Sequence, residues 1–189
     1  MAKVGKKEVE EKIFQVAQNM VLHYGVKGLN MNDLAAECGV AKGTLYKIIG
    51  TKEDLIQKIA FEIFNQNSKV ILEPFRAFED YDEIISCFLD RYLNLCAGYE
   101  RVLTQQIYRE YPGIESLLDE HFQKDIKVVR DRFEQWQQEG VIRKDISPEN
   151  IVTSMAAIND HFVKSELSDE KVVESLLEIF RFFLNSLKV

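Results

Sequence analysis

The sequence contains few of the residues that build tight turns. Its 189 residues include only 9 glycines and 3 prolines, which is too few for a β-sandwich or barrel with many hairpins. No apolar run reaches the length of about 18 residues that a transmembrane helix needs, so we expect no membrane partner. The basic segment 1–7 is not followed by an apolar core, so we also expect no signal peptide and a cytoplasmic location.

Cysteine and the patterns of enzyme active sites are scarce as well. Cys38, Cys87 and Cys96 form an odd set without C-x-x-C spacing, which indicates buried thiols rather than a redox pair. The sequence has no Gly-rich phosphate loop, no nucleophile elbow and no histidine pattern of a metal site. We therefore expect no metal, no cofactor and no enzymatic activity, and a helical enzyme is only the third hypothesis.

The charges are distributed unevenly along the chain. The formal net charge is −7, which by itself argues against a nucleic-acid partner. Residues 1–58, however, carry nine lysines and seven acidic residues, a balance of +2, whereas residues 59–189 have a balance of −9. The two parts can therefore have different partners, because only the second part is acidic.

Apolar residues recur at helical spacing along nearly the whole chain, and no alternating stretch competes as a strand. We predict an all-α fold of about nine helices. Gly25 is expected to end the first helix, Pro74 the fourth and Gly98 the fifth. The predicted helices run over residues 13–24, 31–37, 42–49, 52–73, 81–97, 102–111, 114–138, from 148 onward and from 169 onward.

Polar residues stand where several of these helices begin. Asn30 with Asp33, and Thr51 with Asp54, have the spacing of a capping box, in which each residue binds the backbone N–H of the other. Ser147 precedes a proline, which is another signal of a helix start.

Residues 31–50 have the pattern of a helix-turn-helix. This unit needs a small residue where its helices cross, a turn glycine able to adopt positive φ, and apolar residues that hold the second helix. Ala35, Gly39 and Leu45 occur in that order. Such a unit places its second helix in the major groove of DNA. The residues predicted on the exposed face of that helix include no acid, and they are Lys42, Gly43, Thr44, Tyr46 and Lys47.

Four short segments extend this pattern: GVKG at 25–28, MNDLA at 31–35, GVAKGTLY at 39–46 and KEDL at 52–55. Together they resemble the DNA-binding domain of TetR-family transcriptional regulators over about residues 8–58. Segment 139–149 is similar, more weakly, to the entry into the last two helices of many members.

The resemblance implies a homodimer that binds a palindromic double-stranded DNA operator through its N-terminal domains, most often as a repressor. A small-molecule effector in the C-terminal domain would release the DNA. The implied domains are residues 1–52 for DNA binding and residues 53–189 for ligand binding and dimerisation. By position, Thr44, Tyr46 and Lys52 correspond to phosphate contacts. The whole predicted DNA-binding set is Lys27, Asn30, Lys42, Gly43, Thr44, Tyr46, Lys47 and Lys52.

Some positions depart from the family pattern. Ala41 stands where the family usually has a serine or threonine that caps the second helix, and 48–49 is Ile-Ile where an aromatic residue is common. These departures motivate an alternative function, a helical protein that binds a ligand or partner and has degraded DNA binding.

The resemblance also implies a ligand cavity in the C-terminal part. Aromatic carbon with a few hydroxyl groups suits a mostly apolar ligand, while core packing is the alternative role for each such residue. Arg91, Arg101 and Arg109 could instead hold an anionic ligand or lie on solvated faces. The predicted ligand-binding residues are Phe88, Tyr92, Tyr108, Tyr111, Trp136 and Phe162.

The last two helices are implied as the dimer interface, because the family commonly builds a four-helix interface from them. A role confined to the core of one chain is the alternative. The predicted interface residues are Val152, Met155, Ala156, Asn159, Leu176, Phe180 and Phe183.

Overall fold

The computed structural model describes residues 6–96 and 99–189, and over these residues the chain is all-α, as predicted. One isolated antiparallel bridge joins Ile142 to Lys188. None of the described helices is both long and apolar enough to cross a membrane. The helices are α1 (Lys6–Gly28), α2 (Met31–Cys38), α3 (Lys42–Ile49), α4 (Lys52–Ala77), α5 (Tyr81–Cys96), α6 (Tyr99–Glu110), α7 (Pro112–Glu139), α8 (Pro148–Lys164) and α9 (Asp169–Asn185).

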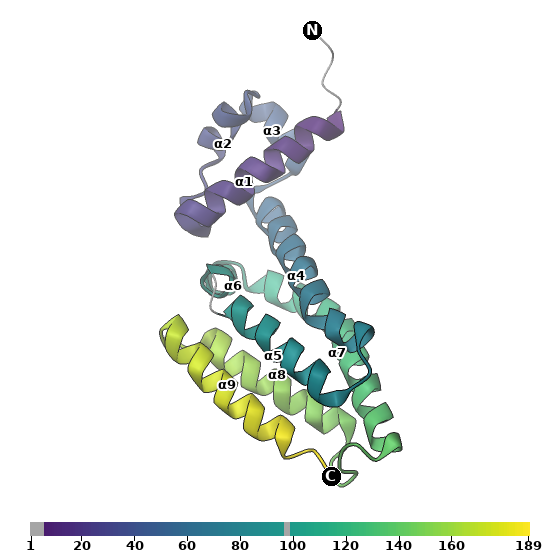
Figure 1. Ribbon diagram of the computed structural model, residues 1–189. Coiled ribbons are helices and arrows are strands. Elements are labelled where there is room, and N and C mark those ends of the chain that lie inside the picture. Colours follow the sequence, from purple (N-terminus) through teal and green to yellow (C-terminus); the bar gives the residue numbers. More distant parts are fainter. Residues whose placement is uncertain (1–5, 97–98) are drawn as a thin grey trace.

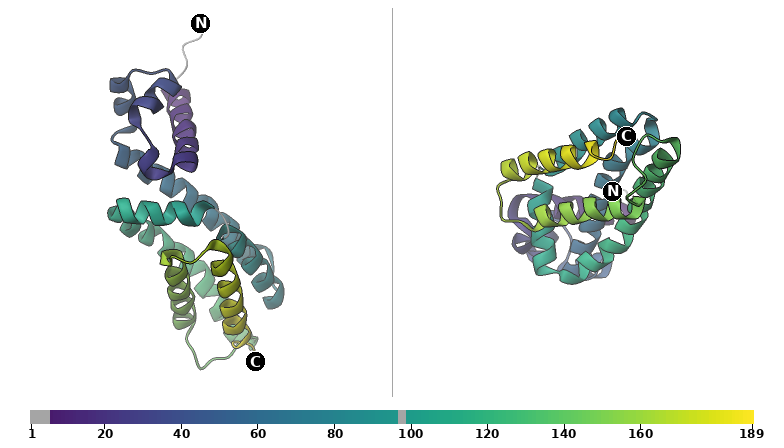
Figure 2. Two further views of the ribbon diagram at one scale, coloured as in Figure 1. Left: turned by 90° about the vertical axis from the view of Figure 1, so that its left-hand side faces the viewer. Right: turned by 90° about the horizontal axis from the view of Figure 1, so that it is seen from below.

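The helices form two groups that α4 connects. Helices α1, α2 and α3 lie together at one end of the molecule, and α4 runs from them into a body made of α5 to α9 (Figure 1). Helices α8 and α9 lie side by side at the opposite end, as a second view also shows (Figure 2). Helix α6 lies at the junction, where it contacts α1.

The buried side chains form two hydrophobic clusters, and α4 contributes to both. The N-terminal cluster joins α1, α2 and α3 to the first half of α4, where Leu55 is buried, and it includes Leu103 of α6 and Ile114 of α7. The C-terminal cluster takes Leu72 from the second half of α4 and packs it with α5, α7, α8 and α9. The N-terminal core thus extends past residue 52, and the predicted domain boundary there stays a prediction.

The C-terminal ends of the helices follow the sequence signals closely, with two differences, whereas α1 begins at Lys6, well before its predicted start at residue 13. Gly25 interrupts α1 with φ 71° and ψ 174°, but a further helical turn continues to Gly28. Pro74 does not end α4, which continues to Ala77. The predicted end of the fifth helix at Gly98 lies outside the described residues.

Arginine side chains explain why α4 can continue past its proline. Pro74 has no N–H, so the carbonyl of Val70 loses its helical donor, and Arg91 Nη1 of α5 donates to that carbonyl instead (3.1 Å). At the end of α4, Arg132 Nη2 of α7 donates to the carbonyl of Phe75 (2.9 Å) and to that of Phe78. These side chains satisfy backbone groups that a helix end otherwise leaves unpaired.

The predicted caps are present, one of them in a different form. Thr51 and Asp54 form the full capping box at the start of α4, with each side chain accepting from the other's backbone N–H. Asn30 caps α2 through the N–H of Asn32 (2.8 Å), one position earlier than a capping box would use. The three cysteines are free thiols, and Cys38 and Cys96 are buried as expected.

Candidate nucleic-acid interface and ligand cavity

A turn glycine sets the geometry between α2 and α3. Gly39 has a left-handed backbone, with φ 71° and ψ 31°, which a residue without Cβ adopts without strain. Its N–H donates to the carbonyl of Ala36 (3.1 Å). Leu45 is fully buried and packs α3 against the N-terminal cluster. The helix-turn-helix predicted over residues 31–50 is therefore present.

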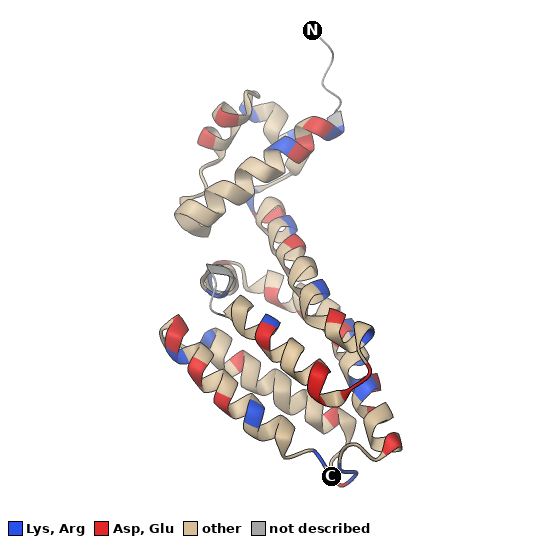
Figure 3. Cartoon of the chain, viewed as in Figure 1, with Lys and Arg blue, Asp and Glu red and all other residues tan. Residues whose placement is uncertain are grey.

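The outer face of α3 is exposed and carries positive charge only. Tyr46 keeps 40% of its surface exposed. Helix α3 has no acidic residue, whereas acidic side chains occur along the helices of the body (Figure 3). This face can therefore approach a polyanion without like-charge repulsion from its own helix. The exposed residues of the predicted set on this face are Lys42, Gly43, Thr44, Tyr46 and Lys47.

The three other predicted DNA contacts, Lys27, Asn30 and Lys52, have different hydrogen-bond and ion-pair partners. Lys52 lies at the N-terminus of α4, with Nζ 3.5 Å from the carbonyl oxygen of Lys27, and partial burial lowers its pKa. Lys27 itself pairs with Glu110 of α6, with Nζ 3.1 Å from Oε1. Asn30 uses its side-chain oxygen to cap α2. Of these three residues, only Lys52 holds an ammonium group without a carboxylate partner among the described residues.

A polar contact connects α1 to α6 at the break in α1. Because Gly25 departs from helical geometry, the N–H of Val26 needs another acceptor, and Gln106 Oε1 of α6 accepts from it (3.0 Å). A Cβ on Gly25 would lie 2.6 Å from that oxygen, so the close approach requires glycine. The neighbouring α6 residues Leu103, Ile107 and Tyr108 face away from this contact into a cavity.

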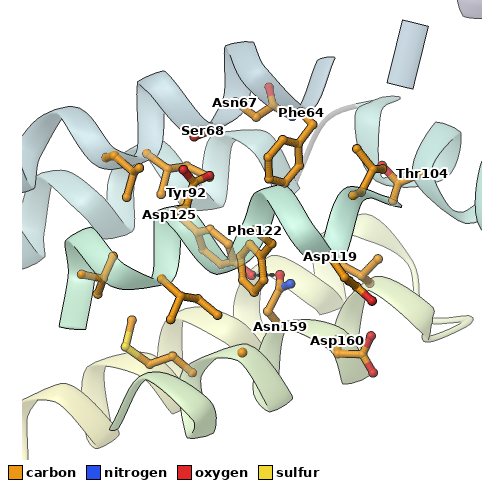
Figure 4. Close-up of a pocket in the computed structure, with 18 of the residues that line it drawn as sticks. Phe64, Asn67, Ser68, Tyr92, Thr104, Asp119, Phe122, Asp125, Asn159 and Asp160 are labelled. Atoms are coloured by element: carbon orange, nitrogen blue, oxygen red, sulfur yellow. Dashed lines mark hydrogen bonds between the residues drawn. The ribbon is translucent and has the colours of Figure 1, made fainter. Parts of the chain in front are cut away.

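The cavity lies between α4, α5, α6, α7, α8 and α9 and has a volume of about 570 Å³ (Figure 4). Three of the predicted ligand residues line it: Phe88, Tyr92 and Tyr108. The other three do not, because Trp136 and Phe162 pack in the C-terminal cluster and Tyr111 packs against the N-terminal cluster. The core-packing alternative therefore applies to those three.

The cavity lining is mainly apolar, with polar groups at separate points. Tyr92 donates its hydroxyl to Asn159 Oδ1 across the cavity wall. Its pKa is raised well above the ordinary value because the hydroxyl is desolvated. Four carboxylates also line the cavity, and the sequence analysis did not single them out: Glu115, Asp119, Asp125 and Asp160. Three of them share α7 with Phe122, in the order Glu115, Asp119, Phe122 and Asp125 at successive spacings of four, three and three, which could have indicated one inward face.

The side chains predicted for a dimer interface are mostly covered within the single chain. Four of them are buried in the C-terminal cluster: Val152, Met155, Leu176 and Phe180. These four therefore have the alternative role, in the core of one chain. Ala156 and Asn159 line the cavity, and Phe183 packs partly against the C-terminal cluster. The apolar residues that α9 leaves exposed lie on another face, with Ile179 at 38% and Phe182 at 77%. The use of α8 and α9 as a dimer interface stays a prediction, and most of the side chains named for it are covered within one chain.

The three arginines considered for an anionic ligand serve structural contacts. Arg101 is buried, and its guanidinium binds Asp169 (Nε to Oδ1, 2.9 Å) and the carbonyl of Leu167 (2.9 Å), which fixes the loop before α9 to α6. Arg91 pairs with Glu73 in addition to its bond to α4, and Arg109 pairs with Glu110. None of the three lines the cavity.

Comparison with known protein families decides the identity of the N-terminal part. The family model "Bacterial regulatory proteins, tetR family" matches residues 13–59. The N-terminal part of the chain therefore matches the TetR family in sequence. A related HTH-type transcriptional regulator of Haemophilus influenzae, itself uncharacterized, is 28% identical over 83 residues. That match spans 42% of this chain and 44% of the relative.

Solved structures extend the likeness from the N-terminal part to the whole chain, at the level of fold. A TetR-family transcriptional regulator from Pectobacterium atrosepticum superimposes with a TM-score of 0.75 at 16% identity, covering 100% of this chain and 98% of the other. The structure of AibR in complex with isovaleryl coenzyme A and operator DNA gives a TM-score of 0.62 at 20% identity, covering 91% and 97%.

Helix α3, the second helix of the helix-turn-helix, begins without a side-chain cap. Ala41 has φ −67° and ψ 143° and provides no side-chain hydrogen bond. Ser147 has nearly the same backbone, φ −68° and ψ 149°, and its side chain accepts from the N–H of Asn150 at the start of α8. The isoleucines at 48–49 are half-buried against the N-terminal cluster and so take the packing role expected of them.

Replacing Ala41 with serine should therefore stabilise the protein. The Ser147 geometry is already in place at position 41, so the new hydroxyl can accept a first-turn N–H of α3 and add about 1 kcal/mol. Urea unfolding followed by circular dichroism measures the change. The parent chain, with alanine at position 41, is the reference without a side-chain cap, and equal stability of Ala41→Ser and the parent chain would contradict the expectation.

Proposed function

We propose that this protein is a ligand-responsive, sequence-specific DNA-binding transcriptional regulator that acts as a homodimer, most simply as a repressor. The observation that carries the proposal is the acid-free, exposed face of α3, held by a helix-turn-helix in the N-terminal cluster. The operator-bound structure of AibR, which has the same fold, supports it. Such a protein has no enzymatic role and acts in the cytoplasm, where the bacterial chromosome lies.

The residues of the DNA-binding face divide into two roles. Thr44, Tyr46 and Lys52 offer hydroxyl and ammonium groups suited to phosphate contacts, which give affinity without reading sequence. Lys42 and Lys47 lie on α3 and can reach base edges, where lysine binds the acceptors of guanine. Lys27 reaches a phosphate only by leaving Glu110.

Lysine substitutions test this division. Lys52→Ala should weaken binding to every sequence and reduce the slope of log K against log salt by about 1, because one phosphate contact is lost. Lys47→Ala should instead change the preference among operator variants by about 1–3 kcal/mol at one position. Operators selected from genomic fragments, followed by fluorescence-anisotropy titrations over a salt series, give both quantities.

Lys69→Ala is the matched control for the lysine series, because Lys69 is exposed on α4 outside the DNA-binding face. Its binding should equal that of the parent chain. If the parent chain selects no sequence at low salt, the result favours the alternative of a helical ligand-binding protein with degraded DNA binding, which the uncapped Ala41 motivates.

The route from ligand to DNA runs through α6. This helix lines the cavity with Leu103, Thr104, Ile107 and Tyr108, and through Gln106 it holds the break in α1. A ligand that shifts α6 would therefore move the point where α1 is attached. Because the two sites share one rigid helix, ligand binding can change the spacing of two N-terminal domains in a dimer.

Substitution of Gln106 tests this attachment. Gln106→Ala removes the acceptor of the Val26 N–H, so that amide should exchange hydrogen faster and the protein should lose about 1–3 kcal/mol of stability. Gln106→Glu keeps an acceptor oxygen at the same reach and should retain the protection. Hydrogen exchange resolved at residue 26 makes the comparison, and unchanged protection in Gln106→Ala would show that α1 is held otherwise.

Dimerisation is proposed through the outer faces of α8 and α9. Phe182 and Ile179 leave apolar surface on α9, which packs beside α8. Neighbouring exposed apolar side chains on one helix face are candidates for contact with a partner. The α8 and α9 pair forms one side of the body, which suits a two-fold contact with a second copy (Figure 2).

An acidic substitution at the exposed aromatic residue tests the dimer. Phe182→Asp should convert a dimer to a monomer, because a buried unpaired carboxylate at a two-fold interface is strongly unfavourable. Val70→Asp is the control, since Val70 has a comparable exposed apolar surface of 44% on α4, away from α8 and α9. Sedimentation velocity measures the mass of each. A dimeric Phe182→Asp protein would place the interface on another face.

A further inference from the structure

The charged residues that line the cavity have one sign. Among the described residues, no lysine, arginine or histidine contributes to the lining, whereas Glu115, Asp119, Asp125 and Asp160 do. Figure 4 shows Asp119 on α7 and Asp160 on α8 at one end of the cavity, with Asp125 farther along α7. The charged side chains of the lining are therefore all negative.

Neighbouring basic groups only partly compensate this charge. Lys164 Nζ lies 2.9 Å from Glu115 and 2.9 Å from Asp160, so those two carboxylates share one ammonium group. Asp119 is exposed and Asp125 is half-buried, and neither has an ion pair or a side-chain hydrogen bond within residues 6–96 and 99–189. Four formal negative charges thus face one positive charge around this cavity.

Tyr108 reports the resulting potential at the acidic end. Its hydroxyl lies among Glu115, Asp119 and Asp160, and its pKa is raised to about 12, first by burial and then by the negative charge of these carboxylates. Lys164 acts in the opposite direction but does not reverse the shift. A negative charge is therefore unfavourable at this end of the cavity, and a positive charge is favourable.

The rest of the lining provides aromatic carbon. Phe64 of α4 and Phe122 of α7 line the cavity from neighbouring walls (Figure 4), and Phe88 of α5 lines it as well. The face of an aromatic ring attracts a cation, and this attraction strengthens where water is excluded. A volume of about 570 Å³ lies in the range of sites for drug-sized organic molecules.

We propose that the cavity binds a lipophilic organic cation, whose apolar part packs on the phenylalanine rings and whose charge is balanced by Asp119 and Asp125. The proposal rests on the proposed function, since it names the effector class of that ligand site. Anionic effectors such as acyl phosphates or nucleotide thioesters are disfavoured, because a phosphate in this cavity would meet carboxylates and no basic side chain.

Two ions of matched size and opposite charge test the proposal. Tetraphenylphosphonium and tetraphenylborate have the same four-phenyl shape, so charge is the main difference between them. Isothermal titration calorimetry on the full chain should give saturable binding of the phosphonium ion. The borate should bind at least tenfold more weakly, which corresponds to about 1.4 kcal/mol.

Charge-neutralising variants then assign the binding to the two free carboxylates. Asp119→Asn and Asp125→Asn should each weaken phosphonium binding by roughly fivefold, and the double variant by more than tenfold. Glu120→Gln is the matched control, because it removes one negative charge from an exposed position on α7 that does not line the cavity. It should bind as the parent does, and melting temperatures verify that all variants fold.

The proposal is overturned if neither ion binds, if tetraphenylborate binds as tightly as tetraphenylphosphonium, or if the double variant binds the phosphonium ion unchanged. These outcomes do not depend on DNA. Failure to find an operator, with selective phosphonium binding retained, would overturn only the proposed DNA-binding function. Operator binding without selective phosphonium binding would overturn only the ligand class.

Discussion

The backbone of α4 has to remain helical over 26 residues, because its two halves belong to different hydrophobic clusters. Leu55 near one end is part of the N-terminal core, and Leu72 near the other is part of the C-terminal core. A break in α4 would remove one of two helices that join the cores, the other being α7, which has Ile114 in the N-terminal cluster and Phe133 in the C-terminal cluster. The proline in its last turn threatens that continuity, and the bond from Arg91 to the carbonyl of Val70 supplies the donor that Pro74 lacks.

The same helix gives the cavity one of its walls. Ile63, Phe64 and Ile71 of α4 face the cavity from the stretch between its two core segments. Helix α6 lies beside that stretch and contacts α1, α4 and α7. The helix-turn-helix, the cavity and the junction between them therefore depend on two helices. Helix α4 contributes to both clusters, and α6 makes the polar contact to α1.

Local chemistry made the fold and the helix-turn-helix predictable from the sequence. The capping box of Thr51 and Asp54, the left-handed Gly39 and the helix start at Ser147 each depend on residues within four positions of one another. The end of α4 was predicted wrongly at Pro74, because the donor that lets the helix continue comes from Arg91, 21 residues away. No local pattern contains that information.

The faces of the C-terminal helices could not be predicted for a similar reason. An apolar stripe shows that a helix buries one side, but it does not say whether that side meets the core, a cavity or a second chain. Val152 and Phe180 were assigned to a dimer interface, yet they are buried and also line the cavity, while the exposed Phe182 was not considered. The carboxylates of α7 were not predicted as cavity residues, because acidic residues on a helix usually face water.

The ammonium group of Lys27 pairs with Glu110, and the proposed function also assigns it to a DNA phosphate. Glu110 belongs to α6, which contacts α1 and has other residues that line the cavity. Lys27 comes just after Gly25, the residue that interrupts α1. If Lys27 contacts a DNA phosphate as proposed, it must first leave Glu110, and the proposed DNA contact would then compete with this attachment of α6 to α1. DNA binding through Lys27 would then cost α6 one of its contacts to α1. An ion pair that stays closed would in turn keep Lys27 from binding phosphate.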